Sequence, residues 1–375
     1  MKKNNLKKLT IVQVLPALDS GGVERGTLEI SKYLISKNQR SIVISEGGRM
    51  SRKLVKEGGQ HIQLPIGKKS LLTLRIIPKL INIFNKNNVD IIHIRSRFPA
   101  WICFIATTFM PHSKRPSIVT TFHGPYSINW YSSIMAKGDA VIAVSKMIKS
   151  YILNNYKINP EKIFLNYRGV DVKEFPYLFK PEKLWIHKWN KDYPKSQNKI
   201  LLTLPARVTR WKGQIDFLHI IALLSKKHPN IHGLIVGNVA VNKLSFLKEL
   251  KDKAIKLNIE DKISFIGHRS DLKEIMSISK IVFSLSNEPE AFGRTTIESL
   301  KIGVPVIGYG HGGVGEQLKE VFSEGIIKKG DIPAAVNLCK AWIKKTPKVT
   351  KTNLFNLETM QSNTLKIYRA VLENR

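Results

Sequence analysis

Residues 281–301 of the chain, IVFSLSNEPEAFGRTTIESLK, hold the pattern that decides the fold. An unbroken apolar run, Ile281–Leu285, leads into a polar loop with proline and glycine, and helical spacing of apolar residues begins near Thr295. Strands without polar alternation are buried on both faces, which is typical of parallel sheets covered by helices. This stretch therefore predicts one strand–loop–helix unit of an α/β protein.

The same unit recurs along all 375 residues. Buried strands are predicted at 9–15, 41–45, 91–94, 117–121, 140–144, 200–205, 233–237, 263–267, 281–285 and 305–308. Helices are predicted at 24–36, 52–57, 71–85, 214–226, 245–257 and 295–301. So many strands suggest two sheets rather than one. The prediction is an α/β chain with two doubly wound, Rossmann-like domains that face each other across a cleft, a fold class set by the strand–helix alternation.

The break between the two domains is predicted at 174–199, which carries three prolines and two tryptophans among many lysines and lacks strand periodicity. The N-terminal Rossmann-like domain then spans 1–173, and the C-terminal one spans 200–352. A last amphipathic stretch within 353–375 is expected to form a helix that packs back toward the N-terminal domain.

Charge is the unusual feature of the composition. There are 61 Lys and Arg against 28 Asp and Glu, a formal net charge of +33, and both halves of the chain are basic. Such an excess predicts an anionic partner, either nucleic acid or an acidic membrane surface. Two cysteines, Cys103 and Cys339, are too few for a disulfide framework and fit a reducing compartment. The basic N-terminus lacks the apolar core of a signal peptide, and no apolar run approaches the roughly 20 residues of a membrane span. The expected location is cytoplasmic.

Two basic stretches bear on the membrane question. Residues 68–86 place lysines among leucines and isoleucines, and residues 180–195 place Trp185, Trp189 and Tyr193 among lysines. Basic helices with interfacial aromatic residues bind anionic leaflets, although an ordinary surface helix explains the first stretch equally well. We expect the protein to lie peripherally on the inner face of the cytoplasmic membrane.

Ligands of open α/β sheets bind outside the carboxyl ends of strands, so the loops that follow strands carry the candidate site. Gly21-Gly22 precedes the first helix and lets backbone N–H groups approach an anion or a sugar, although a plain tight turn needs the same residues. Arg207 and Lys212 lie between a strand and a helix, where two cations and the helix dipole make a diphosphate site. A solvated basic loop is the alternative. No GxGxxG run is present, which disfavours a dinucleotide dehydrogenase.

The loop quoted first carries a pair of carboxylates. Glu290 and Glu298 are eight positions apart, about 2.2 helical turns, so they share a face if the helix already runs from Glu290. Otherwise Glu290 lies on the loop and points at the helix N-terminus. Carboxylates accept paired O–H bonds and suit a sugar or a ribose, although a glutamate near a helix N-terminus needs no ligand. Phe292 and Gly293 are expected to be exposed at the strand end, which favours the binding role.

His123 follows a predicted strand and is either a residue of the site or an ordinary packed or surface histidine. No Asp-x-Asp motif and no His, Cys and Asp cluster with metal spacing occurs in the sequence, which disfavours a metal-dependent transferase. No Ser or Cys lies in a nucleophile elbow. We therefore expect neither a metal nor a cofactor.

Ordered motifs over almost the whole chain resemble glycosyltransferase family 4, retaining enzymes of the GT-B fold. The resemblance rests on GGVE (21–24), TFHG (121–124), DAVIAVS (139–145), RGVD (168–171), Arg207 with WKG (211–213), FIGH (265–268), the Glu290 and Glu298 pair, GVPV (303–306) and GGVGE (312–316). It implies transfer of a sugar from a nucleotide-diphosphate donor, with retention of configuration and without a metal.

The resemblance also implies roles for single residues. Arg207 and Lys212 would bind the donor diphosphate and stabilise its departing charge. Glu290 would hold hydroxyls of the donor sugar, and His123 would lie on the acceptor side near that sugar, so these four form the expected catalytic set. Glu298 would hold the ribose. The expected donor-binding residues are Gly22, Gly267, His268, Phe292, Gly293, Arg294 and Glu298.

Within the family, RGVD (168–171) and EGGRM (46–50) are most similar to bacterial lipopolysaccharide-core and envelope-glycan transferases. The implied partners are a nucleotide-sugar donor, UDP-linked first and GDP-mannose second, a glycolipid or glycan acceptor and an anionic membrane surface, with no nucleic acid. Two alternatives remain open. One is a basic nucleic-acid-binding protein, which the charge suggests, and the other is a GT-B relative that epimerises or hydrolyses nucleotide sugars.

Overall fold

The computed structural model describes residues 7–19 and 21–373, and the chain divides into two compact units. The first unit runs to Tyr167 and resumes at Glu358, and the second unit runs from Arg168 to Leu357. Residues 1–6, part of the basic N-terminus on which the signal-peptide prediction rests, lie outside the described residues. Among the described helices, none is long and apolar enough to cross a bilayer.

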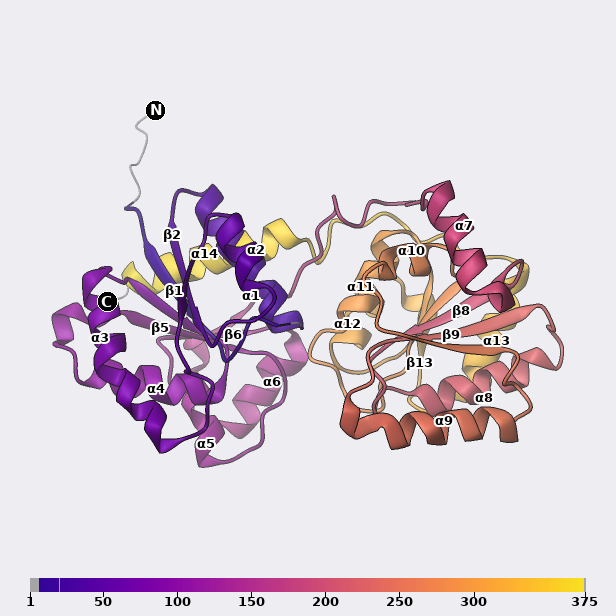
Figure 1. Ribbon diagram of the computed structural model, residues 1–375, viewed down its shortest axis with the longest axis horizontal. Helices are drawn as coiled ribbons and strands as arrows, with labels where there is room; N and C mark the ends of the chain where they lie inside the picture. Colours follow the sequence, from indigo (N-terminus) through magenta and orange to yellow (C-terminus); the bar gives the residue numbers. More distant parts are fainter. Residues whose placement is uncertain (1–6, 20, 374–375) are drawn as a thin grey trace. The chain divides into compact units, whose positions relative to one another are not determined.

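The first unit is built on a parallel sheet of strand order β3-β2-β1-β4-β5-β6-β7 (Figure 1). Its strands are β1 (Thr10–Val14), β2 (Arg40–Ser45), β3 (Gln60–Gln63), β4 (Ile91–Ile94), β5 (Ser117–Phe122), β6 (Ala140–Ala143) and β7 (Ile163–Leu165). Its α-helices are α1 (Gly22–Ser36), α2 (Ser51–Lys56), α3 (Ile77–Lys86), α4 (Arg97–Thr108), α5 (Trp130–Ser133), α6 (Lys146–Asn155) and α14 (Leu357–Glu373). Short 3-10 helices are η1 (Leu71–Ile76), η2 (His112–Lys114), η3 (Ile134–Ala136) and η4 (Pro160–Lys162).

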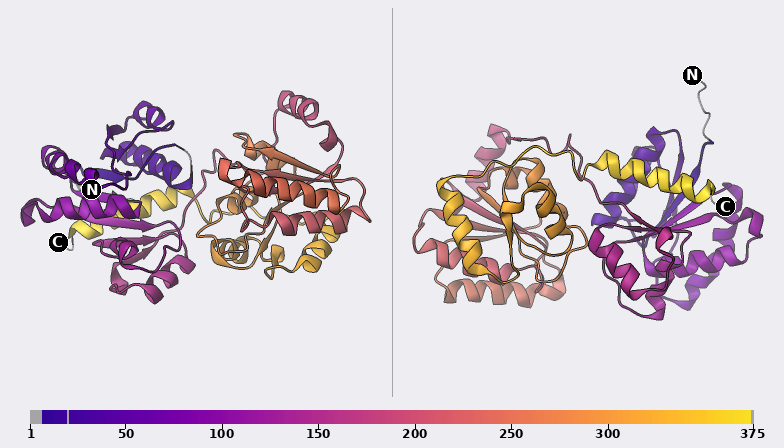
Figure 2. Two further views of the ribbon diagram at one scale, coloured as in Figure 1. Left: turned by 60° about the horizontal axis from the view of Figure 1, so that its bottom comes forward. Right: turned by 180° about the vertical axis from the view of Figure 1, so that it is seen from behind.

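Helix α14 completes the core of the first unit although it comes from the far end of the chain (Figure 2). Its apolar face lies against Ile11 of β1, Ile91 of β4 and neighbouring side chains of the sheet. The buried Tyr368 hydroxyl forms a hydrogen bond with Nδ1 of His93, 2.6 Å away, and Gln361 Nε2 donates to the main-chain oxygen of Glu29 at 2.8 Å. Both apolar packing and polar contacts therefore tie α14 to this unit.

The second unit is built on a parallel sheet of order β10-β9-β8-β11-β12-β13. Its strands are β8 (Ile200–Pro205), β9 (Ile231–Val236), β10 (Ile263–Gly267), β11 (Ile281–Ser284), β12 (Val306–Tyr309) and β13 (Ile326–Ile327). Its α-helices are α7 (Lys183–Asp192), α8 (Gln214–Ser225), α9 (Leu244–Lys256), α10 (Leu272–Ser277), α11 (Arg294–Lys301), α12 (Gly312–Val321) and α13 (Ile332–Lys344), and its 3-10 helices are η5 (Pro194–Ser196), η6 (Val241–Lys243) and η7 (Ser323–Gly325). Helices α8 and α9 lie side by side on one face of the sheet (Figure 1).

The linker predicted at 174–199 is wrong, because this segment is part of the second unit. Its helix α7 stacks Trp185 on Trp189 with ring centroids 5.4 Å apart, and Trp189 is buried in the core. The Trp185 indole N–H donates to Asp271 Oδ2 at 2.8 Å. Trp189 packs against Leu201, Leu234, Val236 and Ile275. The aromatic side chains of 180–195 therefore pack onto the core of the second unit, with Trp189 inside it and Trp185 and Tyr193 half-buried against it.

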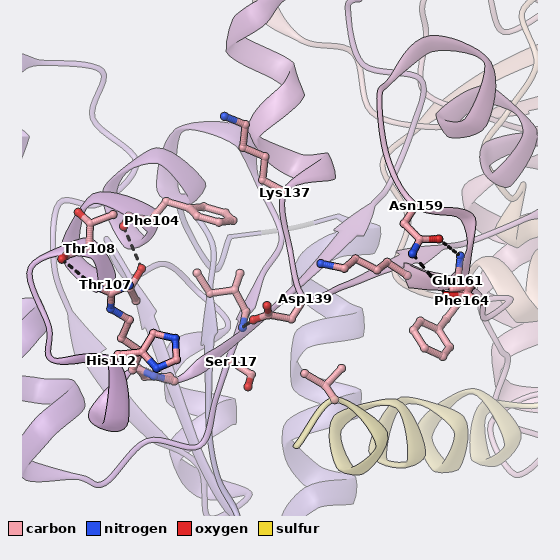
Figure 3. Close-up of a pocket in the computed structure, with 15 residues that line it drawn as sticks. Phe104, Thr107, Thr108, His112, Ser117, Lys137, Asp139, Asn159, Glu161 and Phe164 are labelled. Atoms are coloured by element: carbon pink, nitrogen blue, oxygen red, sulfur yellow. Dashed lines mark hydrogen bonds between the residues drawn. The ribbon is translucent and has the colours of Figure 1, made fainter. Parts of the chain in front are cut away.

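A cavity of about 550 Å³ lies at the amino ends of β5, β6 and β7 in the first unit (Figure 3). Its lining includes Phe104, His112, Lys137, Asp139, Lys162 and Phe164. This is the edge of the sheet opposite to the loops that follow the strands, and none of the predicted site residues lines the cavity.

Candidate active site

The strand order of the second unit places a topological switch point between β8 and β11, because the chain leaves β8 toward β9 and later returns on its other side. The loops after these two strands meet there. The Asn287 N–H donates to the main-chain oxygen of Trp211 at 2.7 Å. Gly213 has a φ of 76°, and a Cβ on it would lie 2.0 Å from the Leu285 oxygen. Only glycine lets the two loops approach this closely.

Lys212 and Glu290 form an ion pair across these loops. The Lys212 Nζ lies 2.7 Å from Glu290 Oε1, and the two side chains are only 11% and 19% exposed. The Ser286 hydroxyl donates to the same oxygen, and the Lys212 ammonium lies 4.1 Å from the centroid of the Trp211 ring. Burial lowers the pKa of Lys212, the like charge of Arg207 lowers that pKa further, and Glu290 opposes both. A partly desolvated cation is therefore fixed at the switch point.

Arg207 belongs to the same loop, and its guanidinium is exposed. The Gln214 side chain donates from Nε2 to the main-chain oxygen of Arg207 at 2.9 Å, which ties the loop to the first residue of α8. The structure thus brings together the two predicted cations, the start of a helix and the Glu290 carboxylate. Electrostatically this corner attracts an anion, since the N-terminus of α8 carries partial positive charge as well.

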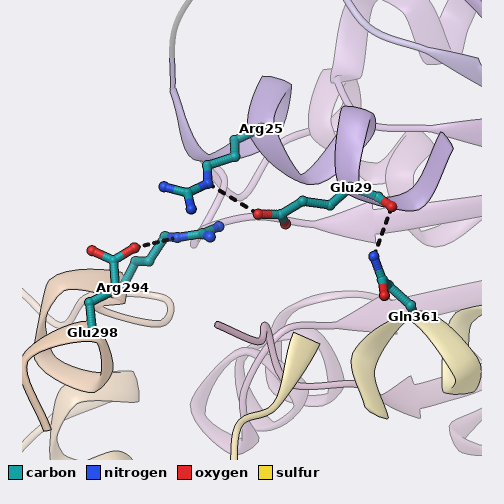
Figure 4. A network of polar contacts seen from close by, with 5 residues as sticks. All are labelled: Arg25, Glu29, Arg294, Glu298 and Gln361. Carbon is teal, nitrogen blue, oxygen red and sulfur yellow. Dashed lines mark hydrogen bonds and ion pairs between the residues drawn. The ribbon is translucent and has the colours of Figure 1, made fainter. Parts of the chain in front are cut away.

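Glu290 and Glu298 do not share a helical face. Helix α11 begins only at Arg294, after Gly293 in the left-handed conformation, so Glu290 lies on the loop as the second of the two alternatives requires. Glu298 is buried on α11, where its Oε1 accepts from Arg294 Nε at 2.7 Å (Figure 4). The Glu298 carboxylate is therefore held in place by the residue one turn before it.

The expectation that Phe292 is exposed is wrong. Its side chain is only 5% exposed and packs edge-to-face on the Phe355 ring, with centroids 5.9 Å apart. The Gln317 side chain donates to the main-chain oxygen of Phe292. Gly293 is buried as well, so only the backbone of this segment is placed to meet a ligand.

Two polar residues of this site were missed by the sequence reasoning. Ser286, two residues after β11, donates to the Glu290 carboxylate, and His311, in the loop after β12, donates from Nε2 to the Ser286 main-chain oxygen at 2.8 Å. Gly312, the first residue of α12, would place a Cβ 2.7 Å from the main-chain oxygen of Glu290, and the Gly313 N–H donates to that oxygen at 2.7 Å. Attention to every loop that follows a strand finds both Ser286 and His311.

Gly267 is the last residue of β10, a strand at the edge of the sheet, and His268 follows it. The Gly237 N–H, after β9, donates to the Gly267 oxygen at 2.8 Å, and a Cβ on Gly237 would lie 2.0 Å from the Ala206 oxygen. The loops after β10, β9 and β8 therefore touch in succession. His268 is exposed and lies at the far end of this row.

The remaining two predicted site residues belong to the first unit. Gly22 is the first residue of α1, at the end of the loop that follows β1, and His123 directly follows β5. Gly22 is exposed and a Cβ there would meet nothing within 4 Å, whereas His123 is half-buried. Both lie at the carboxyl edge of the first sheet.

Comparisons with known proteins agree with this architecture. Residues 20–174 match the model of Glycosyltransferase Family 4, and residues 186–353 match that of Glycosyl transferases group 1. The chain is 34% identical to a glycosyltransferase of Rickettsia africae ESF-5 whose crystal structure it matches with a TM-score of 0.86, over 98% of this chain and 100% of that one.

Two more distant proteins are also similar to this chain. The lipopolysaccharide core biosynthesis mannosyltransferase LpsB of Rhizobium meliloti (strain 1021) is 24% identical over 62% of this chain and 64% of that protein. Anabaena HepE, solved in complex with UDP and glucose, is 19% identical and shares the fold, with a TM-score of 0.82 over 96% of this chain and 100% of that one. The chain spans about two thirds of the length of the first curated relatives that it matches.

The fold prediction is confirmed: two parallel, doubly wound sheets match solved GT-B structures. Two family models cover consecutive parts of the chain, and a relative of more than 30% identity covers nearly all of it. The chain belongs to glycosyltransferase family 4, with the GT-B fold.

Proposed function

We propose that this chain transfers a sugar from a nucleotide-diphosphate sugar to a glycolipid or glycan acceptor in lipopolysaccharide or envelope-glycan biosynthesis. A UDP-sugar is the first choice of donor and GDP-mannose the second, and the transfer proceeds with retention of configuration and without a metal. The observation that carries the proposal is the Lys212–Glu290 ion pair at the switch point of the second sheet. The UDP and glucose bound to HepE and the named activity of LpsB support it.

The charge that develops in this reaction fits the cations of the site. The bond from the anomeric carbon to the diphosphate oxygen breaks while the acceptor hydroxyl oxygen bonds to the same carbon, on the same face. The leaving diphosphate gains negative charge and takes the acceptor proton. Cations fixed beside that charge lower the barrier, since they need no reorganisation during the reaction. Lys212 and Arg207 supply them.

The carboxylates of Glu290 and Glu298 bind different parts of the donor. Lys212 and Ser286 both hold Oε1 of Glu290, and within the described part of the chain Oε2 makes no hydrogen bond. That second oxygen is therefore the one that accepts hydroxyls of the donor sugar. Glu298, fixed by Arg294, accepts the ribose hydroxyls, and the start of α11 faces the phosphates.

Thermal unfolding of the full chain with UDP, UDP-glucose, GDP and GDP-mannose tests the donor site. A ligand at 100 times its Kd stabilises by about 2.7 kcal/mol, which for a unit of this size raises Tm by about 5–10 °C. Lys212→Met and Glu298→Ala should each abolish the shift. Arg210→Met is the matched control, because Arg210 lies in the same loop but pairs outward with Glu249 at 2.5 Å.

Two outcomes of this experiment would count against the proposal. A shift that survives in Lys212→Met shows that the diphosphate lies elsewhere. The donor proposal is wrong if none of the four nucleotides stabilises the unaltered chain.

We further propose that one surface of the first unit binds an anionic bilayer. In η1, Leu71 is 86% exposed and Leu72 is exposed beside it. The Lys69 ammonium lies 5.8 Å from the centroid of the Tyr131 ring, which brings this segment next to the exposed Trp130. Leucine, tryptophan and lysine side chains gathered on one face suit the interface of an acidic leaflet.

Cosedimentation with vesicles that contain phosphatidylglycerol, at about 50 mM salt where electrostatic attraction is strong, tests this surface. The double variant Leu71→Ser with Leu72→Ser should lose binding. The control Val241→Ser removes a side chain that is just as exposed on the second unit, and it should bind like the unaltered chain. Equal binding of all three proteins would refute the assignment of the surface.

A further inference from the structure

Arg95 stands at the switch point of the first sheet. It directly follows β4, and its N–H donates to the main-chain oxygen of Val14, the last residue of β1, at 3.0 Å. The chain leaves β1 toward β2 and later places β4 on the other side of β1, so a ligand of this unit is expected where the loops after β1 and β4 meet. No motif of the sequence analysis included Arg95.

The guanidinium of Arg95 is buried without a counter-charge in contact. The residue is 5% exposed, and both Nε and Nη2 donate to a single neutral acceptor, Gln13 Oε1, at 3.1 and 2.6 Å. In the described part of the chain Arg95 forms no ion pair, and its Nη1 makes no hydrogen bond. Tyr368 and, more weakly, Glu29 act on Arg95 only through space, and both raise its pKa. Burying a charge that lacks an opposite charge is costly.

Burial lowers the pKa of Arg95 to about 10, which leaves the group cationic at neutral pH. The neighbouring Arg97 is used differently. Its Nη1 donates to Ser127 and Ser132, and its guanidinium lies 5.0 Å from the centroid of the Tyr126 ring, so Arg97 secures the loop after β5. Arg95 is thus left as the cation with an open donor at this edge of the sheet.

We propose that Arg95 binds an anionic group of the acceptor, a phosphate or a carboxylate, at the carboxyl edge of the first sheet. The inference rests on the proposed function, since it describes the acceptor of that reaction. A guanidinium and an oxyanion match in charge and in geometry. A bound oxyanion would therefore supply the opposite charge that Arg95 lacks in the fold. Gln13 orients the group, since its Nε2 donates to the main-chain oxygen of Thr27 at 3.0 Å and thereby fixes Oε1 toward Arg95.

Ligand-observed NMR titration of the full chain provides the test, with sn-glycerol 3-phosphate, succinate and glycerol as probes at low salt. The unaltered chain should bind at least one of the two anions more tightly than glycerol, and the stronger one identifies phosphate or carboxylate. Arg95→Met should weaken that binding about ten- to a hundredfold, the range of one hydrogen bond to a charged group. Arg40→Met is the control, since Arg40 is an exposed arginine at the amino end of β2.

A second variant keeps the test decisive should Arg95→Met fold poorly. Gln13→Glu is close to isosteric and supplies an internal carboxylate where Arg95 now has a neutral acceptor, so it should also weaken anion binding at least tenfold. Unchanged binding in Gln13→Glu or in a folded Arg95→Met overturns the proposal, as does equal affinity of the unaltered chain for all three probes. UDP binding by the second unit is measured on the same samples. If the unaltered chain does not bind UDP, the donor proposal is wrong, and the titrations with the two anions still decide whether Arg95 binds an anion.

Discussion

Replacing Gly213 by alanine tests how closely the loops after β8 and β11 approach. The φ of 76° costs an alanine about 1 kcal/mol, and its Cβ would lie 2.0 Å from the Leu285 oxygen, a backbone atom that moves only with β11. Forcing the strands apart adds about 2 kcal/mol. Gly267 provides the matched control, because its φ of 79° is almost the same and a Cβ there meets nothing within 4 Å. Alanine at Gly267 therefore carries the conformational cost alone.

Differential scanning calorimetry of the full chain measures both variants. For a unit of this size 1 kcal/mol corresponds to about 2–4 °C in Tm, so Gly267→Ala should lower the transition of the second unit by about 2–4 °C and Gly213→Ala by about 6–12 °C. Gly213→Ala should also lose stabilisation by UDP, since it displaces the neighbouring Lys212. Two variants that melt within about 2 °C of each other would refute the close approach of the loops, and with it the geometry of the proposed donor site.

Three further predictions concern buried groups elsewhere. Burial lowers the pKa of His232 from 6.5 to about 4. The unfolded chain therefore binds more protons than the folded chain below pH 6.5, so lowering the pH from 7 to 5 should reduce the free energy of unfolding by about 2 kcal/mol. His232→Gln should remove this pH dependence from calorimetric melts. Tyr368→Phe deletes the hydrogen bond to His93 and should destabilise the first unit by about 1–2 kcal/mol, seen as a lower Tm and faster proteolysis; an unchanged Tm would contradict the tie between α14 and β4. Cys103 and Cys339 are buried, which raises the pKa of both thiols, so neither should react with an aromatic disulfide reagent at pH 8 until the chain is unfolded, and rapid labelling of the native chain would contradict their burial.

The sequence was a good guide to the strands of the two sheets. Apolar runs bounded by glycine, proline and polar loops place β4, β8 and β10 at the observed residues, because the strands of a parallel sheet covered by helices are mostly apolar. The short strands β7 and β13 at the sheet edges escaped notice, since two or three residues carry no periodic signal. Helix α7 escaped for a different reason. Its buried face consists of aromatic residues surrounded by lysine, a composition that a linker or a membrane-binding segment shares.

The sequence predicted the site only where neighbouring residues in the chain were enough to identify it. Loops after strands identified Arg207, Lys212 and Glu290, but which of them pair depends on the strand order, and that is settled by packing far along the chain. Phe292 shows the limit most clearly, because the partner that buries it, Phe355, lies outside the loop and its helix. Arg95 could not be predicted as a site residue, because nothing in the sequence distinguishes it from the other 60 lysines and arginines until its burial is known.

The position of α14 in the first unit has a consequence for how the chain is made. A ribosome delivers β1 to β7 first, yet the side chains that cover Ile11 and Ile91 emerge only after the whole second unit has been synthesised. The earlier half of the nascent chain must therefore wait with part of its apolar sheet uncovered, while the later unit, which is continuous in sequence, is free to fold at once. The second unit can therefore complete its fold before the first unit does, although it is synthesised later. Until α14 is made, the first unit exposes the apolar surface that a chaperone would protect.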